Sequence, residues 1–193
     1  MIRMPHMKKL KLENHTSYGC YQFSLSHLGI LLLALLYPLI GFSSIPQQTV
    51  TPSSIGFSLS NTGTDWELTP APPDADNIVF LFRGKQIVNG HQATLTARKE
   101  KLEQEKDLKQ YTRKWMNEYP KFGYNVLGQK PFTLDGRNAY VIDLISAASE
   151  KQSRQVISEK NGTVVVLTCL DNKEQFSRSL PFCNKIIRSF KWE

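Results

Sequence analysis

Two cysteines, Cys169 and Cys183, stand close together near the end of the chain and are the residues best suited to chemistry. A pair of thiols can form a disulfide, contribute to a metal site, or hold a reactive nucleophile. A zinc site usually needs four ligands, and a thiol nucleophile needs a base that activates it. After residue 43 the chain has a single histidine, His91, beside a predicted turn. The metal and nucleophile interpretations therefore lack partners, and we predict no metal site.

A lone carboxylate is the second candidate for chemistry. Asp143 interrupts the apolar segment 140–145, where a buried acid could be tuned for proton transfer. In a sheet such an acid more often faces outward or pairs with an arginine, and Arg154 on the adjoining predicted hairpin is suitable. There is no glycine-rich phosphate loop and no pair of acids at catalytic spacing. The sequence therefore predicts no catalytic residue and no cofactor, with a hydrolase or lyase that uses Asp143 as the alternative.

Three tryptophans, Trp66, Trp115 and Trp192, could line a groove for a small ligand. Trp115 falls on the apolar stripe of a predicted helix, which favours a place in the core. Trp192 follows the last predicted helical turn and can either pack on the sheet or stand exposed. A small-ligand carrier is thus a further alternative, and it requires a cavity between helix and sheet.

Residues 28–42 form an uncharged apolar run, with four basic residues before it and two serines after it. This is the layout of a secretory signal. The run is shorter than the roughly 20 residues of a transmembrane helix and contains Pro38. Because the segment before it is long for a signal peptide, residues 1–43 are either a cleaved signal or an N-terminal membrane anchor. Cys20 precedes the run, whereas the cysteine of a lipoprotein would follow it.

Residues 44–54 are rich in Ser, Thr, Pro and Gln and carry no charge. Such a segment cannot bury enough apolar surface to fold by itself. We predict a flexible linker there, followed by one domain over residues 55–193.

The net charge of +7 comes partly from the leader, which holds four of the 24 basic and one of the 17 acidic residues. In the rest of the chain the two signs are mixed, as at Lys99, Glu100 and Lys101. No uninterrupted basic patch is available to neutralise many phosphates. The sequence therefore predicts no binding to nucleic acid.

Three Asx-Gly dipeptides, at 89–90, 135–136 and 161–162, predict tight hairpins because these residues accept positive φ at little cost. The paired strands would cover 77–82 with 92–98, 131–134 with 138–145, and 154–160 with 163–168. A short additional pair is expected at 56–60 and 66–69. Residues 78–82 and 164–167 are nearly continuous apolar runs, which indicates cover on both faces of the sheet.

Two amphipathic helices could provide this cover. The first is expected over residues 99–119, with Pro120 and Gly123 ending it. The second is expected from Asp171, with Glu174 completing a capping box and Pro181 causing a kink or a fresh start. The two apolar stripes consist of Leu108, Tyr111, Trp115, Tyr119 and Phe122, and of Phe176, Leu180, Cys183, Ile187 and Phe190. The predicted fold class is α+β, a central antiparallel sheet flanked by helices.

This arrangement brings the two cysteines together. Cys169 closes the last predicted strand, and Cys183 lies on the helix face that must look back at the sheet. In an oxidising compartment two such cysteines usually pair. We therefore predict a disulfide between Cys169 and Cys183 and not a reactive thiol.

The order of elements resembles that of the PsbP-like superfamily of α/β/α sandwiches. The residues that carry the likeness are segment 56–60 with Trp66, the hairpin around Leu95, the helix ending near Phe122, and segment 176–190. The group includes PsbP proteins of the oxygen-evolving complex, the Ran-binding nuclear-import factor and small bacterial envelope domains. The resemblance implies a non-enzymatic domain that binds or stabilises a partner, and it assigns no functional residue here.

Leader, linker and cysteines together predict an exported protein in the periplasm or on the extracytoplasmic face of the inner membrane. We expect it to be a non-enzymatic module that binds another protein of the cell envelope. Residues 28–42 could tether it to the membrane.

Overall fold

The computed structural model describes residues 49–50, 55–75, 77–102 and 106–193. The predicted leader and most of the predicted linker lie outside the described residues. Within the described part of the chain, no helix has both the length and the apolar character needed to cross a membrane. The first described residues, β1 (Thr49–Val50), pair with a later strand, so a strand begins inside the segment expected to be a linker.

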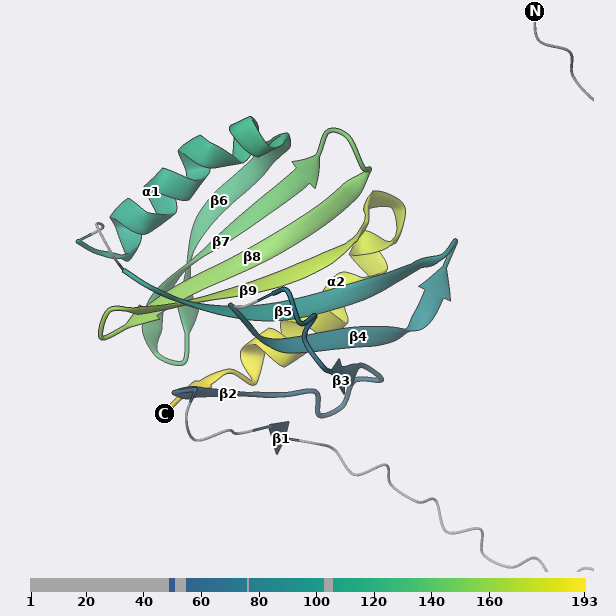
Figure 1. Ribbon diagram of the computed structural model, residues 1–193, viewed down its shortest axis with the longest axis horizontal. Helices are drawn as coiled ribbons and strands as arrows, with labels where there is room; N and C mark the ends of the chain where they lie inside the picture. Colours follow the sequence, from purple (N-terminus) through teal and green to yellow (C-terminus); the bar gives the residue numbers. More distant parts are fainter. Residues whose placement is uncertain (1–48, 51–54, 76, 103–105) are drawn as a thin grey trace, which may run out of the picture. The chain divides into compact units, whose positions relative to one another are not determined.

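Seven strands form one antiparallel sheet in the order β3-β4-β5-β9-β8-β7-β6 (Figure 1). Asn89, Asp135 and Asn161 all have φ near +50°, and the glycine after each also has positive φ. These are the tight hairpin turns that the dipeptides predict, and the sheet confirms all three hairpins. The strands are β3 (Glu67–Thr69), β4 (Ile78–Val88), β5 (His91–Lys101), β6 (Tyr124–Leu134), β7 (Arg137–Ser146), β8 (Lys151–Lys160) and β9 (Thr163–Asn172).

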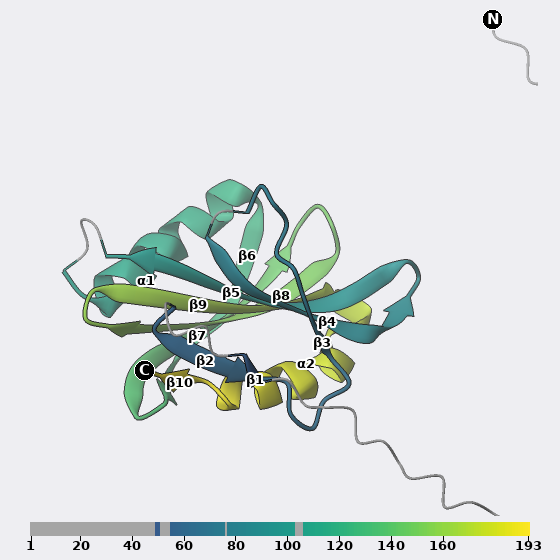
Figure 2. The same ribbon diagram turned by 60° about the horizontal axis from the view of Figure 1, so that its bottom comes forward.

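Strand β9 lies in the middle of the sheet and is buried on both faces, as its apolar run predicts. Val165 and Leu167 face one layer of core, whereas Val164 and Val166 face the other. The neighbouring strand β5 alternates instead, with Ala93, Leu95 and Ala97 buried and the residues between them half-buried. The α+β sandwich expected from the sequence is thus the observed fold (Figure 2).

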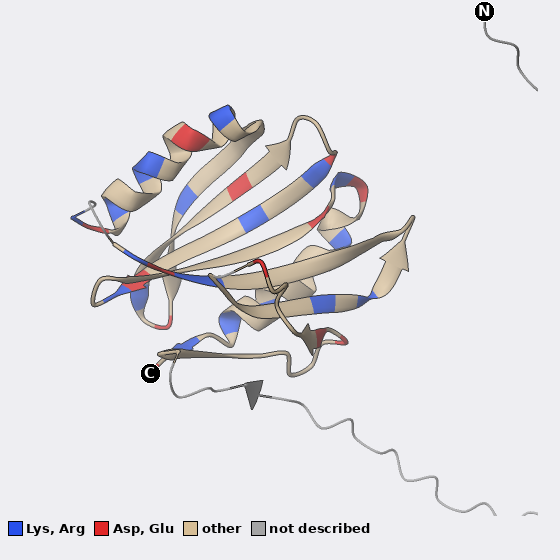
Figure 3. Ribbon diagram, in the orientation of Figure 1, with Lys and Arg blue, Asp and Glu red and all other residues tan. Residues whose placement is uncertain are grey.

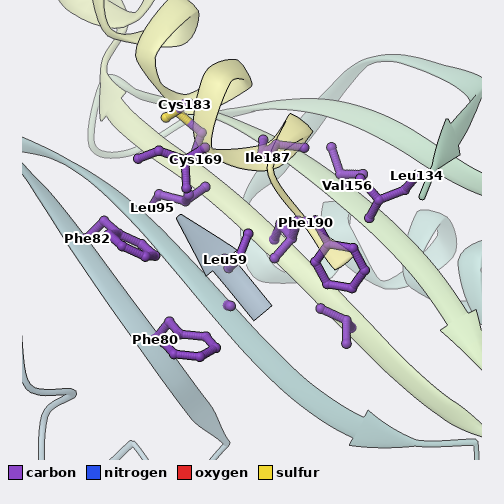
Figure 4. Close-up of a cluster of buried hydrophobic side chains, with 14 of the residues drawn as sticks. Leu59, Phe80, Phe82, Leu95, Leu134, Val156, Cys169, Cys183, Ile187 and Phe190 are labelled. Carbon is purple, nitrogen blue, oxygen red and sulfur yellow. A yellow bond between two sulfur atoms is a disulfide. The ribbon is translucent and has the colours of Figure 1, made fainter. Parts of the chain in front are cut away.

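Helix α2 (Lys173–Arg188) covers one face of the sheet. Its apolar side chains meet those of β4, β5, β8 and β9 together with β2 (Phe57–Ser60), and Figure 4 shows this core. The ring of Phe57 stacks on that of Phe190, with centroids 5.2 Å apart. This layer is the larger of the two and fills the space between α2 and the sheet.

Helix α1 (Leu108–Glu118) and the short helix η1 (Tyr119–Phe122) cover the opposite face. Leu108, Tyr111 and Tyr119 are buried against β7, β8 and β9. Gly123 ends η1 with φ of +77°, a conformation that glycine adopts without strain. Phe122, expected on the buried stripe, instead points into solvent.

The helix starts differ from those predicted. Residues Lys99 to Lys101 continue strand β5 because they pair with β9 as far as Thr163, and the helix begins only at Leu108 after the N-cap Asp107. Asp171 likewise belongs to β9, and α2 begins at Lys173. Its N-cap, Asn172, makes no side-chain capping bond, so the predicted capping box is wrong. The helix also runs through Pro181 as one element, without the fresh start considered above.

The short pair expected at 56–60 and 66–69 does not form. Strand β2 pairs instead with β1 and with β10 (Lys191–Trp192), and β3 pairs with β4. Ser60 and Ser189 reinforce this contact of the two chain ends, because the Ser189 hydroxyl accepts from the Ser60 N–H and donates to the Ser60 carbonyl. Such a pairing across most of the domain has no local sequence signal.

Candidate functional site

Cys169 on β9 and Cys183 on α2 form a disulfide, the pairing that the sequence predicts, with Cα atoms 6.0 Å apart. Both residues are fully buried in the α2 layer (Figure 4). Neither sulfur is available as a nucleophile or a metal ligand. The bond therefore anchors α2 to the centre of the sheet.

The carboxylate of Asp143 is held by Arg154, its direct neighbour across β7 and β8. Nε of Arg154 donates to Oδ1 at 2.7 Å and Nη2 donates to Oδ2 at 2.9 Å. The two side chains are 26% and 20% exposed, and the hydrogen bonds to Asp143 raise the pKa of Arg154. Because both oxygens are engaged, Asp143 and Arg154 form a bidentate ion pair across the two strands.

His91 lies at a pocket of about 100 Å³ between the β4–β5 hairpin and α2, which we call the hairpin pocket. Asp171 and Ser179 line the same pocket, so the residue types of a hydrolytic triad are brought together. In the part of the chain that the structure describes, no hydrogen bond joins the three. The Ser179 hydroxyl donates instead to the Phe176 carbonyl. Among the described residues, Ser179 is therefore not hydrogen-bonded to a base in this structure.

Metal binding finds no support in the described residues, where no group of three or more His, Cys, Asp or Glu side chains could hold an ion. The tryptophans do not share a groove either. Trp66 and Trp192 belong to the α2 layer, and Trp115 belongs to the α1 layer. Trp66 lines the hairpin pocket, where the lack of a side chain at Gly84 lets its ring approach the β4 backbone.

A polar network on the α1 face has no counterpart in the sequence predictions. The hydroxyl of Tyr111 donates to Glu100, and that of Tyr119 donates to Gln155. Burial raises the pKa of Tyr119 to about 12 and raises that of Tyr111 as well, the latter also through its bond to Glu100. The sequence signal for this network is the alternating pattern of β5. Extending the strand to Lys101 would have placed Glu100 in the sheet, where it meets Tyr111.

The hairpin pocket has an exposed apolar rim. Phe182 on α2 lines it and is 42% exposed, an unusual state for a large aromatic side chain. The rest of the lining is mixed, with Lys85, Arg178 and Asp65 among its charged members. An aromatic anchor beside charged groups is typical of a surface that binds protein.

A second pocket, of about 140 Å³, lies on the other side of α2. We call it the basic groove, because Lys130, Arg154 and Arg188 line it with Asn184. Of these residues, sequence reasoning singled out Arg154 alone. The other cations stand on β6 and α2, two elements whose approach is set by the tertiary fold.

No family model matches the chain, and no curated protein matches it. Solved structures do. Cyanobacterial PsbP (CyanoP) from Synechocystis superposes with a TM-score of 0.57 at 12% identity, covering 81% of this chain and 99% of that one. The fold is PsbP-like.

Two further solved structures superpose on this chain. LpqN of Mycobacterium tuberculosis, described as involved in cell envelope biogenesis, gives a TM-score of 0.55 at 17% identity, covering 77% of this chain and 86% of that one. A Pseudomonas aeruginosa protein of unknown function, described as a putative regulator, superposes with a TM-score of 0.53 at 15% identity. The match covers 64% of this chain and 94% of that one. At these identities the likeness concerns the fold.

Proposed function

We propose that this protein is an exported, non-enzymatic module of the cell envelope that binds another envelope protein. The observation that carries the proposal is the buried disulfide between Cys169 and Cys183, since structural disulfides belong to oxidising compartments. Export would rest on residues 1–43, as a signal peptide or as an anchor through residues 28–42. Residues 44–54 would link that leader to the domain. LpqN, which is described as involved in cell envelope biogenesis, supports a role in the envelope.

The hydrogen bonding of the residues that could do chemistry supports a binding function over a catalytic one. Asp143 is engaged by Arg154, and the three triad-like residues of the hairpin pocket are not connected to one another. A carrier with an internal cavity is disfavoured because apolar side chains fill the layer between α2 and the sheet. The hairpin pocket, with Phe182 at its rim, is the surface that we assign to the partner.

Site-specific photocrosslinking in intact cells tests this assignment. A photoreactive phenylalanine analogue replaces Phe182 in the full chain, and a matched variant carries it at Arg113, an exposed position of α1 on the opposite face of the sheet. We expect a discrete crosslinked envelope protein at position 182 and none at position 113. Equal labelling at both positions, or none at either, would contradict a specific partner surface.

Enzymatic turnover is the competing outcome. Activity of the purified full chain that is lost in Asp143→Asn and kept in Asp74→Asn, an exposed acid elsewhere, would support the carboxylate enzyme instead. Absence of an Asp143-dependent activity together with a crosslink at position 182 would support the binding module.

A further inference from the structure

The basic groove lies between α2 and the part of the sheet that α2 leaves uncovered. Lys130 comes from β6, Arg154 from β8, and Asn184 and Arg188 from α2. Asn184 and Arg188 are four residues apart and therefore lie on one side of the helix. Phe182, at the hairpin pocket, is on the opposite side, so the groove and the proposed partner surface are separate.

The strand register explains why the sheet cations meet there. Lys130 is opposite Val141 on β7, and Val141 is opposite Val156 on β8. Arg154 stands two residues before Val156, so it points to the same face. Both cations thus point from the sheet into the groove. Its apolar lining includes Val141 and Val156 from the sheet and Ile187 from α2.

The groove has an excess of positive charge. Among the described residues, Asp143 is the one acid bonded to the groove cations, and it binds two of the three guanidinium nitrogens of Arg154. Within the described residues, Lys130 and Arg188 make no ion pair. Three cations and one carboxylate leave two positive charges around a small pocket. Like charges in so confined a place repel, and a bound anion would remove that repulsion. Figure 3 shows where Lys and Arg, and Asp and Glu, occur along the strands and helices of the domain.

The arrangement is suited to an oxyanion with several acceptor atoms. Asp143 fixes the plane of the Arg154 guanidinium, so that Nη1 is a preorganised donor. Lys130, Arg188 and the Asn184 amide add donors from two other elements. A carboxylate offers two oxygens and one charge, whereas a phosphate monoester offers more oxygens and close to two charges at neutral pH. The apolar lining would contact the organic part of the ester.

We propose that the basic groove, with Lys130, Arg154, Asn184 and Arg188 as its donors, binds a phosphate group. The phosphate belongs either to a soluble monoester or to the monoester headgroup of a phospholipid, as in phosphatidic acid. Both sources present the same oxygens to the same four side chains. This site is independent of the proposed protein contact at Phe182.

Binding is measured by nuclear magnetic resonance on the isotope-labelled full chain. Sodium phosphate and glycerol 3-phosphate are titrated, with sodium acetate and sodium chloride at equal ionic strength as comparison anions. We expect saturable shifts of the signals of Asn184 and Arg188 with both phosphates and only weak, unsaturated shifts with the other salts. Equal responses to acetate or chloride would overturn the proposal, because they would indicate general screening of charge.

Charge-removing variants locate the site. Lys130→Gln and Arg188→Gln should each raise the dissociation constant by about tenfold, the loss expected for one charge-assisted hydrogen bond. Arg113→Gln is the matched control, because it removes the same charge from an exposed position of α1, on the opposite face of the sheet. It should leave the constant unchanged within about twofold. Both groove cations are exposed, so the variants should fold, and retained near-native amide spectra verify this. Unchanged affinity in both groove variants would refute the site.

Vesicles distinguish the two sources. The full chain is mixed with vesicles that contain phosphatidic acid and with phosphatidylcholine vesicles and then floated on a density gradient. Flotation with phosphatidic acid that falls in Lys130→Gln and Arg188→Gln but not in Arg113→Gln would assign the phosphate to a lipid. Soluble binding without such flotation would assign it to a free monoester. If neither soluble phosphate nor vesicles bind in a manner that depends on Lys130 and Arg188, the proposal fails.

Discussion

The carboxylate of Asp135 accepts a hydrogen bond from the backbone N–H of Trp192, with Oδ2 2.9 Å from the nitrogen. Its other oxygen accepts from Nζ of Lys191 at 3.0 Å. Asp135 belongs to the turn between β6 and β7, whereas Trp192 belongs to the last strand. One turn residue thus holds the end of the chain, and β10 in turn pairs with β2.

The Asp135→Asn variant should be less stable at neutral pH. The hydrogen bond from Trp192, and secondarily that from Lys191, lower the pKa of Asp135 below its ordinary value of 3.8. A lowered pKa in the folded state stabilises the protein above the ordinary value, and this contribution is lost as the pH falls through the folded value. We expect a decrease of a few degrees in melting temperature at pH 7. The difference from wild type should shrink below about pH 4. Asp74→Asn, an exposed acid, is the control, and a pH-independent difference would contradict the prediction.

The three long hairpins could be predicted because their signal is local. Asn89, Asp135 and Asn161 each precede a glycine between apolar runs, and each adopts the positive φ that such a turn needs. The buried face of β5, which includes Leu95, agrees with the alternation of apolar and polar residues along that strand. The disulfide could be predicted as well. Cys169 lies at the end of a strand and Cys183 on the apolar face of a helix, and both positions can be recognised from the local sequence.

The errors came from long-range pairing. Residues 99–101 were expected to begin a helix, but they pair with β9 as far as Thr163. Likewise, Phe57 lies in a strand that pairs with Trp192, far along the chain. In both places tertiary contacts outweigh local propensity.

The candidate sites were harder to predict than the fold. The pair of Asp143 and Arg154 was recognised because both residues flank one hairpin connection. Lys130 and Arg188 meet only when α2 crosses the sheet, and isolated cations in a sequence are usually solvated. The hairpin pocket likewise depends on how far β4 and β5 extend beyond the helix.

Removing the disulfide should destabilise the domain strongly. The double variant Cys169→Ala/Cys183→Ala is expected to lose about 3 kcal/mol of unfolding free energy, the value for closing a loop of this size. Urea unfolding of the full chain measures it. A reductant should lower the stability of the wild type by a similar amount and leave the double variant unchanged. Cys20→Ala, which removes the third cysteine, is the control, and a wild type insensitive to reductant would contradict the prediction.

The ion pair of Asp143 and Arg154 should stabilise the fold through the contact between the two side chains. Asp143→Asn and Arg154→Met are each expected to lower the unfolding free energy by about 1–3 kcal/mol, because each leaves a half-buried polar partner without its charge-assisted bonds. The double variant should lose less than the sum of the two, with a coupling energy of about 1 kcal/mol. Additive losses in this cycle would mean that the two side chains stabilise the sheet separately.

The hydroxyl of Tyr119 should ionise at a higher pH than that of an ordinary tyrosine. Burial against the sheet raises its pKa to about 12, and its hydroxyl donates to Oε1 of Gln155. Because the folded pKa is raised, the stabilisation is complete below pH 10 and is lost as the pH rises toward 12. Ultraviolet titration should therefore show a tyrosinate step near pH 12 that Tyr119→Phe removes. The same residue in urea should ionise near its ordinary pKa of about 10. If the step persists in Tyr119→Phe, the group that ionises there is a different one.

The variant should also lose less stability than the wild type between pH 10 and 12, since it has no hydroxyl whose ionisation favours the unfolded chain.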